Sequence, residues 1–207
     1  MINVIEAKDR KFYYFMKGLG TWIFKLIYQP KIEGLENIPN EGRILLAGNH
    51  TKWLDPLLII ASSKRQVHFL AKDELFHGAT KFIVEKMGCI PVNRRIHDKD
   101  ALENTYRFLE NDLCIGIFPE GTINRTDDII MPFKIGAVKA AYETNSIIVP
   151  FTIVGEYKLF RKGPKLEFMK PIKVGNDLAK ENERLMKIIK NKLKKEGFKN
   201  GRKNDTI

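Results

Sequence analysis

The chain has 207 residues, of which 43% are hydrophobic, and its formal net charge is +11. This length favours a single domain, and the hydrophobic fraction is sufficient for a packed core, which excludes a disordered tail protein. Cys89 and Cys114 each lie in an apolar run, outside any CxxC or Cys/His cluster. We interpret them as buried free thiols in a reducing compartment.

The positive charge is concentrated at the two ends. Residues 1–31 contain six Lys or Arg against two acidic residues, and residues 176–207 contain ten against five. Residues 32–175 are nearly neutral, with twenty against eighteen. Basic ends predict attraction to an anionic surface, either acidic lipid or nucleic acid, although simple solvated ends have the same composition.

No apolar run approaches the roughly 20 residues that span a bilayer. The best candidate, residues 18–28, contains Lys25. Residues 1–10 are charged and do not resemble a signal peptide. We therefore expect a cytoplasmic protein, either soluble or peripheral on a membrane.

The N-terminal segment shows a helical pattern. Apolar side chains recur at spacings of three and four between residues 12 and 27, with lysines beside the main apolar stripe, and Pro30 follows. The pattern predicts an amphipathic helix that ends before Pro30. Aromatic residues with lysines nearby are typical of a helix in the bilayer interface, but a helix packed on its own domain fits equally well.

The rest of the chain alternates short apolar runs with helical patterns. The predicted strands are 43–48, 67–71, 89–92, 113–118, 147–154 and 166–168. The predicted helices are 54–62, 79–87, 98–110, 134–144 and 178–195. This order indicates the α/β class, with a mostly parallel central sheet flanked by helices. The chain divides into an amphipathic helical segment (1–30), the α/β domain (31–175), and a basic helix and tail (176–207).

Polar residues follow the predicted strands at the points where the strands end. His50 and Asp55 follow the first strand, Lys72 the second, Arg94 the third and Glu120 the fourth. Ligands of parallel sheets bind outside the carboxyl ends of the strands. A base, acids and cations would therefore converge on one rim, which defines a site hypothesis.

His50 and Asp55 are compatible with a strand end and a helix start. Pro56 suits the first helical position and should place Asp55 in an extended conformation. Asp55 could then cap the helix and also bond a ring nitrogen of His50, which would fix its tautomer and stabilise the imidazolium. Taken alone, the pair is better explained as a cap and a turn residue, and the neighbouring motifs reverse that preference.

Four motif blocks occur in order along the domain. They are Asn49–Asp55, Gly88–Arg94, Phe118–Thr122 and Ile148–Pro150. In this order they resemble the glycerophospholipid acyltransferase family, whose best-known members are the 1-acylglycerol-3-phosphate acyltransferases. A single His-x4-Asp pattern is weak evidence, whereas the ordered set is specific, and the resemblance runs from about Lys31 to about Pro171.

The resemblance implies a role for each matching residue. His50 would deprotonate the acceptor hydroxyl while Asp55 orients and charges the imidazole. The alkoxide would attack an acyl thioester directly, and the absence of a Gly-x-Ser-x-Gly elbow agrees with a reaction without an acyl-enzyme. Arg94 would bind the acceptor phosphate, and Glu120 and Gly121 would position the glycerol part of the acceptor.

The remaining expectations also follow from the resemblance. Lys72, Thr122, Arg125 and Lys134 are further candidate substrate-binding residues. The acceptor is expected to be lysophosphatidate, and the donor is either acyl-CoA or acyl carrier protein. No metal and no cofactor are implied, and an anionic membrane surface, on the inner face of the cell membrane, is the expected partner rather than nucleic acid.

Two positions depart from the family pattern, and they bear on the acceptor. Lys52 replaces a common Ser, and Ile123 replaces a common Arg after the FPEGT sequence, whereas the Arg at position 125 matches a second one. Three alternatives stay open: an acyltransferase for another lysolipid, a thioester hydrolase that uses the same His–Asp pair, and a non-catalytic basic domain that binds membrane or nucleic acid.

Overall fold

The computed structural model describes residues 10–93 and 98–198. The strands are β1 (Lys31–Glu33), β2 (Ile44–Gly48), β3 (Val67–Lys72), β4 (Ile90–Val92), β5 (Cys114–Ile117), β6 (Ile147–Val154) and β7 (Lys165–Phe168). The α-helices are α1 (Arg10–Tyr28), α2 (Asp55–Ser62), α3 (Lys81–Lys86), α4 (Lys99–Glu110), α5 (Gly136–Glu143) and α6 (Leu178–Lys195). Short 3-10 turns are η2 (Leu35–Asn37), η3 (Asp73–Phe76) and η4 (Gly78–Thr80).

The strands form one mostly parallel sheet in the order β1-β7-β6-β2-β5-β3-β4, and only the β6–β7 pair is antiparallel. The central strand β2 pairs with β5 on one side and β6 on the other, and all five of its residues are buried. A continuous apolar run buried on both faces is characteristic of parallel sheets covered by helices. The prediction of an α/β fold with a parallel sheet is confirmed.

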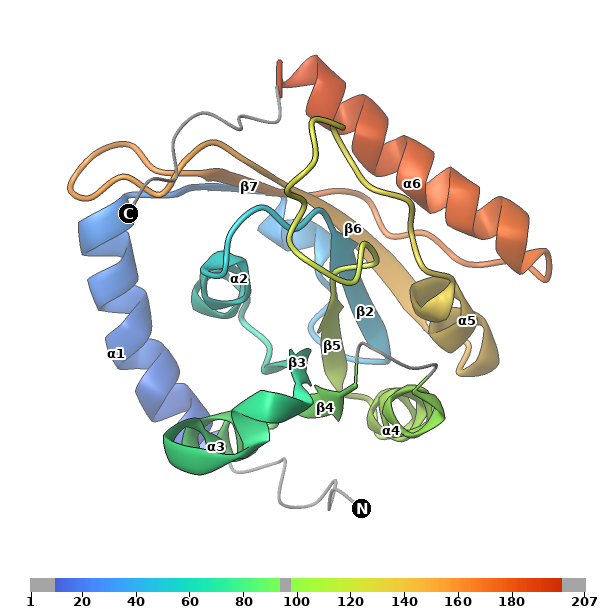
Figure 1. Cartoon of the computed structure of the whole chain (residues 1–207), viewed down its shortest axis with the longest axis horizontal. Coiled ribbons are helices and arrows are strands. Elements are labelled where there is room, and N and C mark those ends of the chain that lie inside the picture. Colours follow the sequence, from blue (N-terminus) through green and yellow to red (C-terminus); the bar gives the residue numbers. More distant parts are fainter. Residues whose placement is uncertain (1–9, 94–97, 199–207) are drawn as a thin grey trace.

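The two faces of the sheet support two separate cores (Figure 1). Helices α4, α5 and α6 cover one face, where Leu45 and Ala47 of β2 point. Helices α1 and α2 cover the other face, where Ile44 and Leu46 point. The alternation along β2 shows how a strand of period two divides its side chains between two helical layers.

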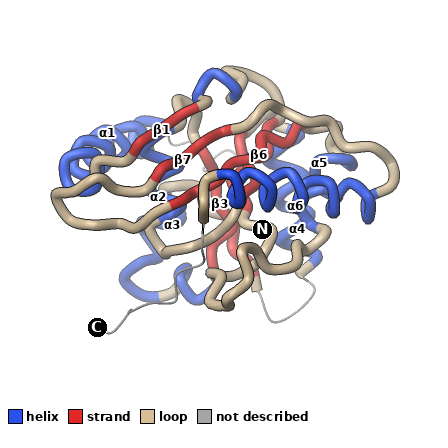
Figure 2. The backbone as a smooth tube through the Cα atoms, turned by 90° about the horizontal axis from the view of Figure 1, so that it is seen from above, coloured by secondary structure: helices blue, strands red, loops and turns tan. Residues whose placement is uncertain are grey.

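The helices at the two ends both pack on the sheet domain, seen from above in Figure 2. Tyr13 and Phe24 of α1 are buried against α2 and the sheet. Leu185, Ile189 and Leu193 of α6 are buried on the opposite face. In the described residues, no helix is both long enough and apolar enough to cross a membrane.

The observed elements differ from the predicted ones at the short edges. Strand β1 was not predicted, because three residues carry too little periodicity to be recognised. It pairs with β7, which lies far away in the sequence. The predicted helix 79–87 consists of the 3-10 turn η4 followed by the shorter α3. The other predicted elements match within two residues.

Candidate active site

The site begins where β2 ends. Gly48 is required there, because a Cβ atom would lie 2.3 Å from the ring of Phe151 on β6. The side chain of Asn49 then accepts a hydrogen bond from the Ile153 N–H (2.8 Å) and donates one to the Ile153 carbonyl (2.9 Å). This pair of hydrogen bonds links the following turn to β6. His50 therefore lies at the carboxyl edge of the sheet in a fixed orientation.

His50 and Asp55 form a direct, buried pair. The distance from His50 Nδ1 to Asp55 Oδ2 is 2.9 Å, and His50 is 6% exposed while Asp55 is fully buried. Because an ionised carboxylate can only accept, Nδ1 carries the proton and Nε2 carries the free lone pair. Among the described residues, Nε2 has no hydrogen-bond partner. The ring is therefore in the tautomer that a general base needs.

The predicted helix-capping role of Asp55 is wrong. Asp55 is the first residue of α2 itself, and Leu54 occupies the cap position with helical angles. The Asp55 carboxylate instead points back along the chain, where it accepts the N–H groups of Thr51 (2.6 Å) and Lys52 (2.8 Å). These two bonds close the His50–Asp55 turn and hold the carboxylate beside the imidazole.

Tyr157 also bonds Asp55, and sequence reasoning did not identify it. Its hydroxyl donates to Asp55 Oδ1 at 2.7 Å. Burial raises the pKa of Tyr157, and the Asp55 carboxylate raises it further, so the phenol remains a donor at neutral pH. The only available signal was its position just after the carboxyl end of β6, on the same rim as His50.

Glu120 fixes the backbone of the site. Its Oε1 accepts the His50 N–H at 2.9 Å, and its Oε2 accepts the Met131 N–H at 2.8 Å. The side chain is buried, and burial raises its pKa above the ordinary value, although the two N–H groups counteract this. The N–H of Asn124 also donates to the His50 carbonyl at 2.9 Å. The loop after β5 is therefore bonded directly to the turn that contains His50.

Phe118 supports the imidazole from one side. Its ring stacks on His50 with centroids 4.0 Å apart and an angle of 14° between the planes. Phe69 of β3 stacks behind Phe118 at 5.6 Å. Together with the bond to Asp55, this stack restricts the imidazole to one orientation, which leaves Nε2 as the reactive edge.

Gly121 and Lys134 bring two motifs into contact. Gly121 has φ +76, and a Cβ atom at this position would lie 2.8 Å from Lys134 Cε. The Lys134 N–H also donates to the Pro119 carbonyl at 2.8 Å. Only a glycine allows both the left-handed conformation and this close approach. The amine of Lys134 is thereby placed over the loop that holds His50.

The other predicted substrate-binding residues are at the surface or beyond the described ranges. Thr122 and Arg125 are exposed on the loop after β5, and Lys72 is exposed at the end of β3. Arg94 lies outside the described residues. Substrate contact by all seven candidates, which include Glu120, Gly121 and Lys134, stays a prediction. In residues 10–93 and 98–198, no group of three or more His, Cys, Asp or Glu could hold a metal ion.

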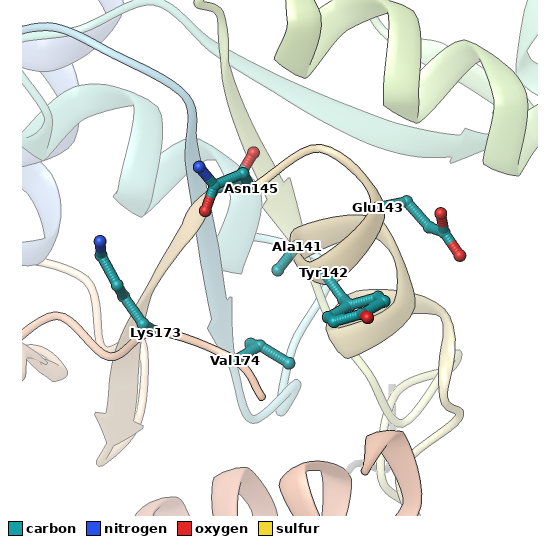
Figure 3. Close-up of a pocket in the computed structure, with 7 residues that line it drawn as sticks. Ala141, Tyr142, Glu143, Asn145, Lys173 and Val174 are labelled. Carbon is teal, nitrogen blue, oxygen red and sulfur yellow. The ribbon is translucent and has the colours of Figure 1, made fainter. Parts of the chain in front are cut away.

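A separate cavity of about 390 Å³ lies at the other end of the sheet (Figure 3). Asn145 and Ser146, which line it, directly precede β6, whereas His50 follows the end of the neighbouring parallel strand β2. Lys173 and Tyr142 complete much of its wall. Because parallel strands end at one edge and begin at the other, this cavity takes no part in the His50 site.

Comparison with known proteins agrees with this geometry. The family model described as Acyltransferase matches residues 29–154, which include His50, Asp55 and Glu120. The chain belongs to this acyltransferase family.

Two relatives carry names that are more specific than the description of the family. The chain is 36% identical over 134 residues to a 1-acyl-sn-glycerol-3-phosphate acyltransferase of Borreliella burgdorferi, covering 63% of this chain and 53% of that protein. It is 30% identical over 140 residues to the protein of the same name in Bacillus subtilis, covering 64% and 68%. The chain thus spans between about half and two thirds of these two relatives.

A solved structure shares the fold. The crystal structure of the 1-acyl-sn-glycerophosphate (LPA) acyltransferase from Thermotoga maritima superposes with a TM-score of 0.75 at 20% identity. The match covers 92% of this chain and 83% of that one. At this level of identity the similarity establishes a common fold.

Proposed function

We propose that this chain transfers an acyl group from a thioester to the free hydroxyl of 1-acylglycerol-3-phosphate, giving phosphatidate. The observation that carries the proposal is the buried His50–Asp55 pair, in which Nε2 is free and faces the carboxyl rim of the sheet. The names of the relatives support lysophosphatidate as the acceptor.

The geometry supports a direct transfer. Nε2 of His50 accepts the proton of the acceptor hydroxyl while the oxygen attacks the thioester carbonyl. Asp55 stabilises the imidazolium that forms, and Tyr157 and two backbone N–H groups hold the carboxylate in place. The C–S bond then breaks, the thiolate takes the proton from Nε2, and the ester and free thiol leave. The base is regenerated, and neither metal nor cofactor enters the cycle.

Cations on the same rim suit a phosphorylated acceptor. Arg94 would bind the phosphate, as its place in the second motif implies, with Lys72, Arg125 and Lys134 as further anion partners. Lys52 follows His50 closely and would supply a charge that Ile123 does not provide. Because a lysine lacks the bidentate fork of an arginine, we expect a less strict selection of the phosphate group. The donor is either acyl-CoA or acyl carrier protein.

Helix α1 supports a position at the membrane surface. Its large apolar side chains that point outward are Tyr14, Phe15, Leu19, Trp22, Ile23 and Leu26, and Trp22 is 67% exposed. Exposed aromatic and aliphatic residues on a basic amphipathic helix are typical of interfacial binding. We propose that α1 docks the enzyme as a peripheral protein on the inner, anionic face of the cell membrane.

The proposed reaction is tested with a labelled acyl thioester and lysophosphatidate in mixed micelles. Wild type should form phosphatidate, and His50→Ala should lose at least a hundredfold in rate, because general base catalysis contributes about that much or more. His77→Ala is the matched control, since His77 is an exposed histidine that pairs with Asp73 at the surface. Parallel assays with acyl-CoA and acyl carrier protein identify the donor.

Acceptor dependence separates the alternatives. If thioester loss does not increase when lysophosphatidate is added, and only free fatty acid appears, the chain is a hydrolase. If another lysolipid is acylated in preference to lysophosphatidate, only the proposed identity of the acceptor is wrong. If neither donor is consumed with any lysolipid, the catalytic proposal is wrong and a binding domain remains.

A further inference from the structure

The loop between β6 and β7 exposes two large apolar side chains. Leu159 is 61% exposed and Phe160 is 68% exposed. The neighbouring charged residues are Lys158, Arg161, Lys162 and a single acid, Glu156, which pairs with Lys158 at 3.0 Å. Across the described residues, Arg161 and Lys162 have no acidic partner. The loop thus exposes two apolar side chains that cations flank in the sequence.

Folding requirements do not explain Phe160. Its backbone has φ +55, in the left-handed region that is unfavourable for a bulky side chain. The turn itself is held by the bond from the Phe160 N–H to the Ile27 carbonyl at 2.6 Å. Glycine or asparagine would make the same backbone bond with less strain. An exposed aromatic side chain kept in a strained conformation points to a role for that side chain.

The loop is continuous with the exposed face of α1. Phe160 contacts the last turn of α1 through Ile27, and the Gly163 N–H donates to the Gln29 carbonyl at 3.4 Å. In Figures 1 and 2 the loop lies beside the C-terminal end of α1, at one edge of the molecule. Trp22 and Leu26 are exposed on that half of the helix. Two elements distant in sequence meet at the end of α1, and each exposes apolar side chains.

We propose that residues 158–162 form a second membrane-contact element whose partner is an anionic phospholipid bilayer. Leu159 and Phe160 enter the boundary between headgroups and acyl chains, and the three cations contact anionic headgroups. The inference rests on the proposed function, because α1 docks on the same bilayer. Two exposed apolar side chains flanked in the sequence by cations suit a bilayer surface, because acyl chains accept apolar groups and anionic headgroups attract cations.

This placement connects docking to the catalytic residues. Tyr157 directly precedes the element, and its hydroxyl bonds Asp55. Tyr28 at the end of α1 contacts the Tyr157 ring, with centroids 5.6 Å apart. The bilayer surface would therefore meet the protein close to the carboxylate that orients His50. An acceptor held in the bilayer would need to move only a short way to reach Nε2.

The experiment measures vesicle binding by co-sedimentation of the full chain. Vesicles are made of phosphatidylcholine alone or with added phosphatidylglycerol. The loop variant Leu159→Ser/Phe160→Asn should bind the mixed vesicles roughly tenfold more weakly than wild type, because it loses two inserted side chains. Asparagine tolerates the left-handed backbone, so the fold is kept. The control Ile135→Ser/Tyr142→Ser removes two exposed apolar side chains elsewhere and should bind like wild type.

A charge variant tests the role of the cations. Lys158→Gln/Arg161→Gln/Lys162→Gln should lose affinity for phosphatidylglycerol vesicles, by roughly fivefold for each cation that contacts a headgroup. Its weak binding to pure phosphatidylcholine should not change. A second readout is local: a fluorophore on Leu159→Cys should shift to shorter wavelength with vesicles, and the same label on Tyr142→Cys should not.

The outcomes separate this inference from the proposed function. If the loop variant binds like wild type while Phe15→Ser/Trp22→Ser binds less, α1 docks the protein and the second element is overturned. If wild type binds neither kind of vesicle, the proposed docking by α1 and the proposed docking by the loop are both wrong. Loss of binding to an acidic carrier protein, with vesicle binding retained, would assign the loop to that protein and overturn the inference.

Discussion

The helices at the two ends have similar composition but different surroundings. Both are basic and amphipathic, yet α6 buries one apolar stripe on the sheet and presents lysines to solvent. Helix α1 buries Tyr13 and Phe24 on one side and exposes a second set of apolar residues, including Phe15 and Trp22, on the other. Charge alone therefore does not distinguish the two helices, whereas the apolar residues that α1 exposes on its second face do.

The ion pairs of α6 reinforce this difference. Lys192 contacts Glu167 of β7, and Lys165 of β7 contacts Glu196 just after the helix at 2.9 Å. Part of the positive charge at the C-terminal end is therefore already paired within the domain. Lysines in such pairs are less free to meet an external surface.

The largest expected effect is on stability, and it should differ between a buried residue of α6 and an exposed residue of α1. Ile189→Ala in α6 should lower the free energy of unfolding by about 2–5 kcal/mol, because it leaves a cavity under a fully buried side chain. Trp22→Ala in α1 should change it by roughly 0.5 kcal/mol or less, since that side chain is mostly exposed. Urea denaturation measures both. Equal losses would show that the outer face of α1 packs within the protein.

A buried histidine makes the face under α4 sensitive to acid. Burial lowers the pKa of His68 from 6.5 to about 4, and its Nδ1–H donates to the Gly88 carbonyl at 2.8 Å. Below pH 6.5 His68 takes up a proton in the unfolded chain but not in the folded chain. Stability therefore falls between pH 6.5 and about 4. The total loss is roughly 3 kcal/mol.

The test is denaturation at several pH values. His68→Asn keeps a donor for Gly88 but does not titrate, so its stability should decline less steeply in this range. His77→Asn is the control, because His77 is exposed. If the stability of His68→Asn falls with pH as steeply as that of wild type, other groups cause the acid sensitivity.

Removing the Tyr157 hydroxyl should affect catalysis more than binding. Tyr157→Phe deletes one hydrogen bond to the Asp55 carboxylate, and such bonds to charged groups contribute about 1.5–3 kcal/mol. We expect kcat to fall by roughly tenfold with KM nearly unchanged, since the bond orients the base and not the substrate. Tyr142→Phe should behave like wild type. A rise in KM alone would instead place Tyr157 in the acceptor site.

The smallest effect concerns the charges of α6. Lys187→Gln/Lys190→Gln removes two exposed cations, and we expect a change in vesicle affinity of less than about threefold if α6 stays away from the bilayer. Lys11→Gln/Lys25→Gln on α1 removes the same charge and should reduce the affinity more. Equal reductions would mean that net charge, and not the exposed apolar face of α1, governs binding.

The structure also changes how α1 should be tested. Deletion of residues 1–30 is a natural way to release the protein from membranes. Because Tyr13 and Phe24 are core residues, that deletion would also expose apolar surface of α2 and the sheet. Substitutions confined to the outer face separate the two roles.

The sequence by itself determined the parallel α/β sheet, the His50–Asp55 pair and the loop that contains Glu120. These features rest on local patterns, in which apolar runs of strand and helix length and short motifs follow one another. The orientation of α1 was left open between packing and membrane contact, because an amphipathic pattern does not say what covers each face.

Only the tertiary structure decided which distant groups meet at the site. Tyr157 reaches Asp55 across 102 positions, Glu120 accepts the N–H of His50 across 70, and Phe118 stacks on the imidazole. It also decided that Asp55 closes its own turn and does not cap α2. The physical reason is that these contacts depend on strand order: placing β2 between β5 and β6 brings together three strand ends that no local pattern relates.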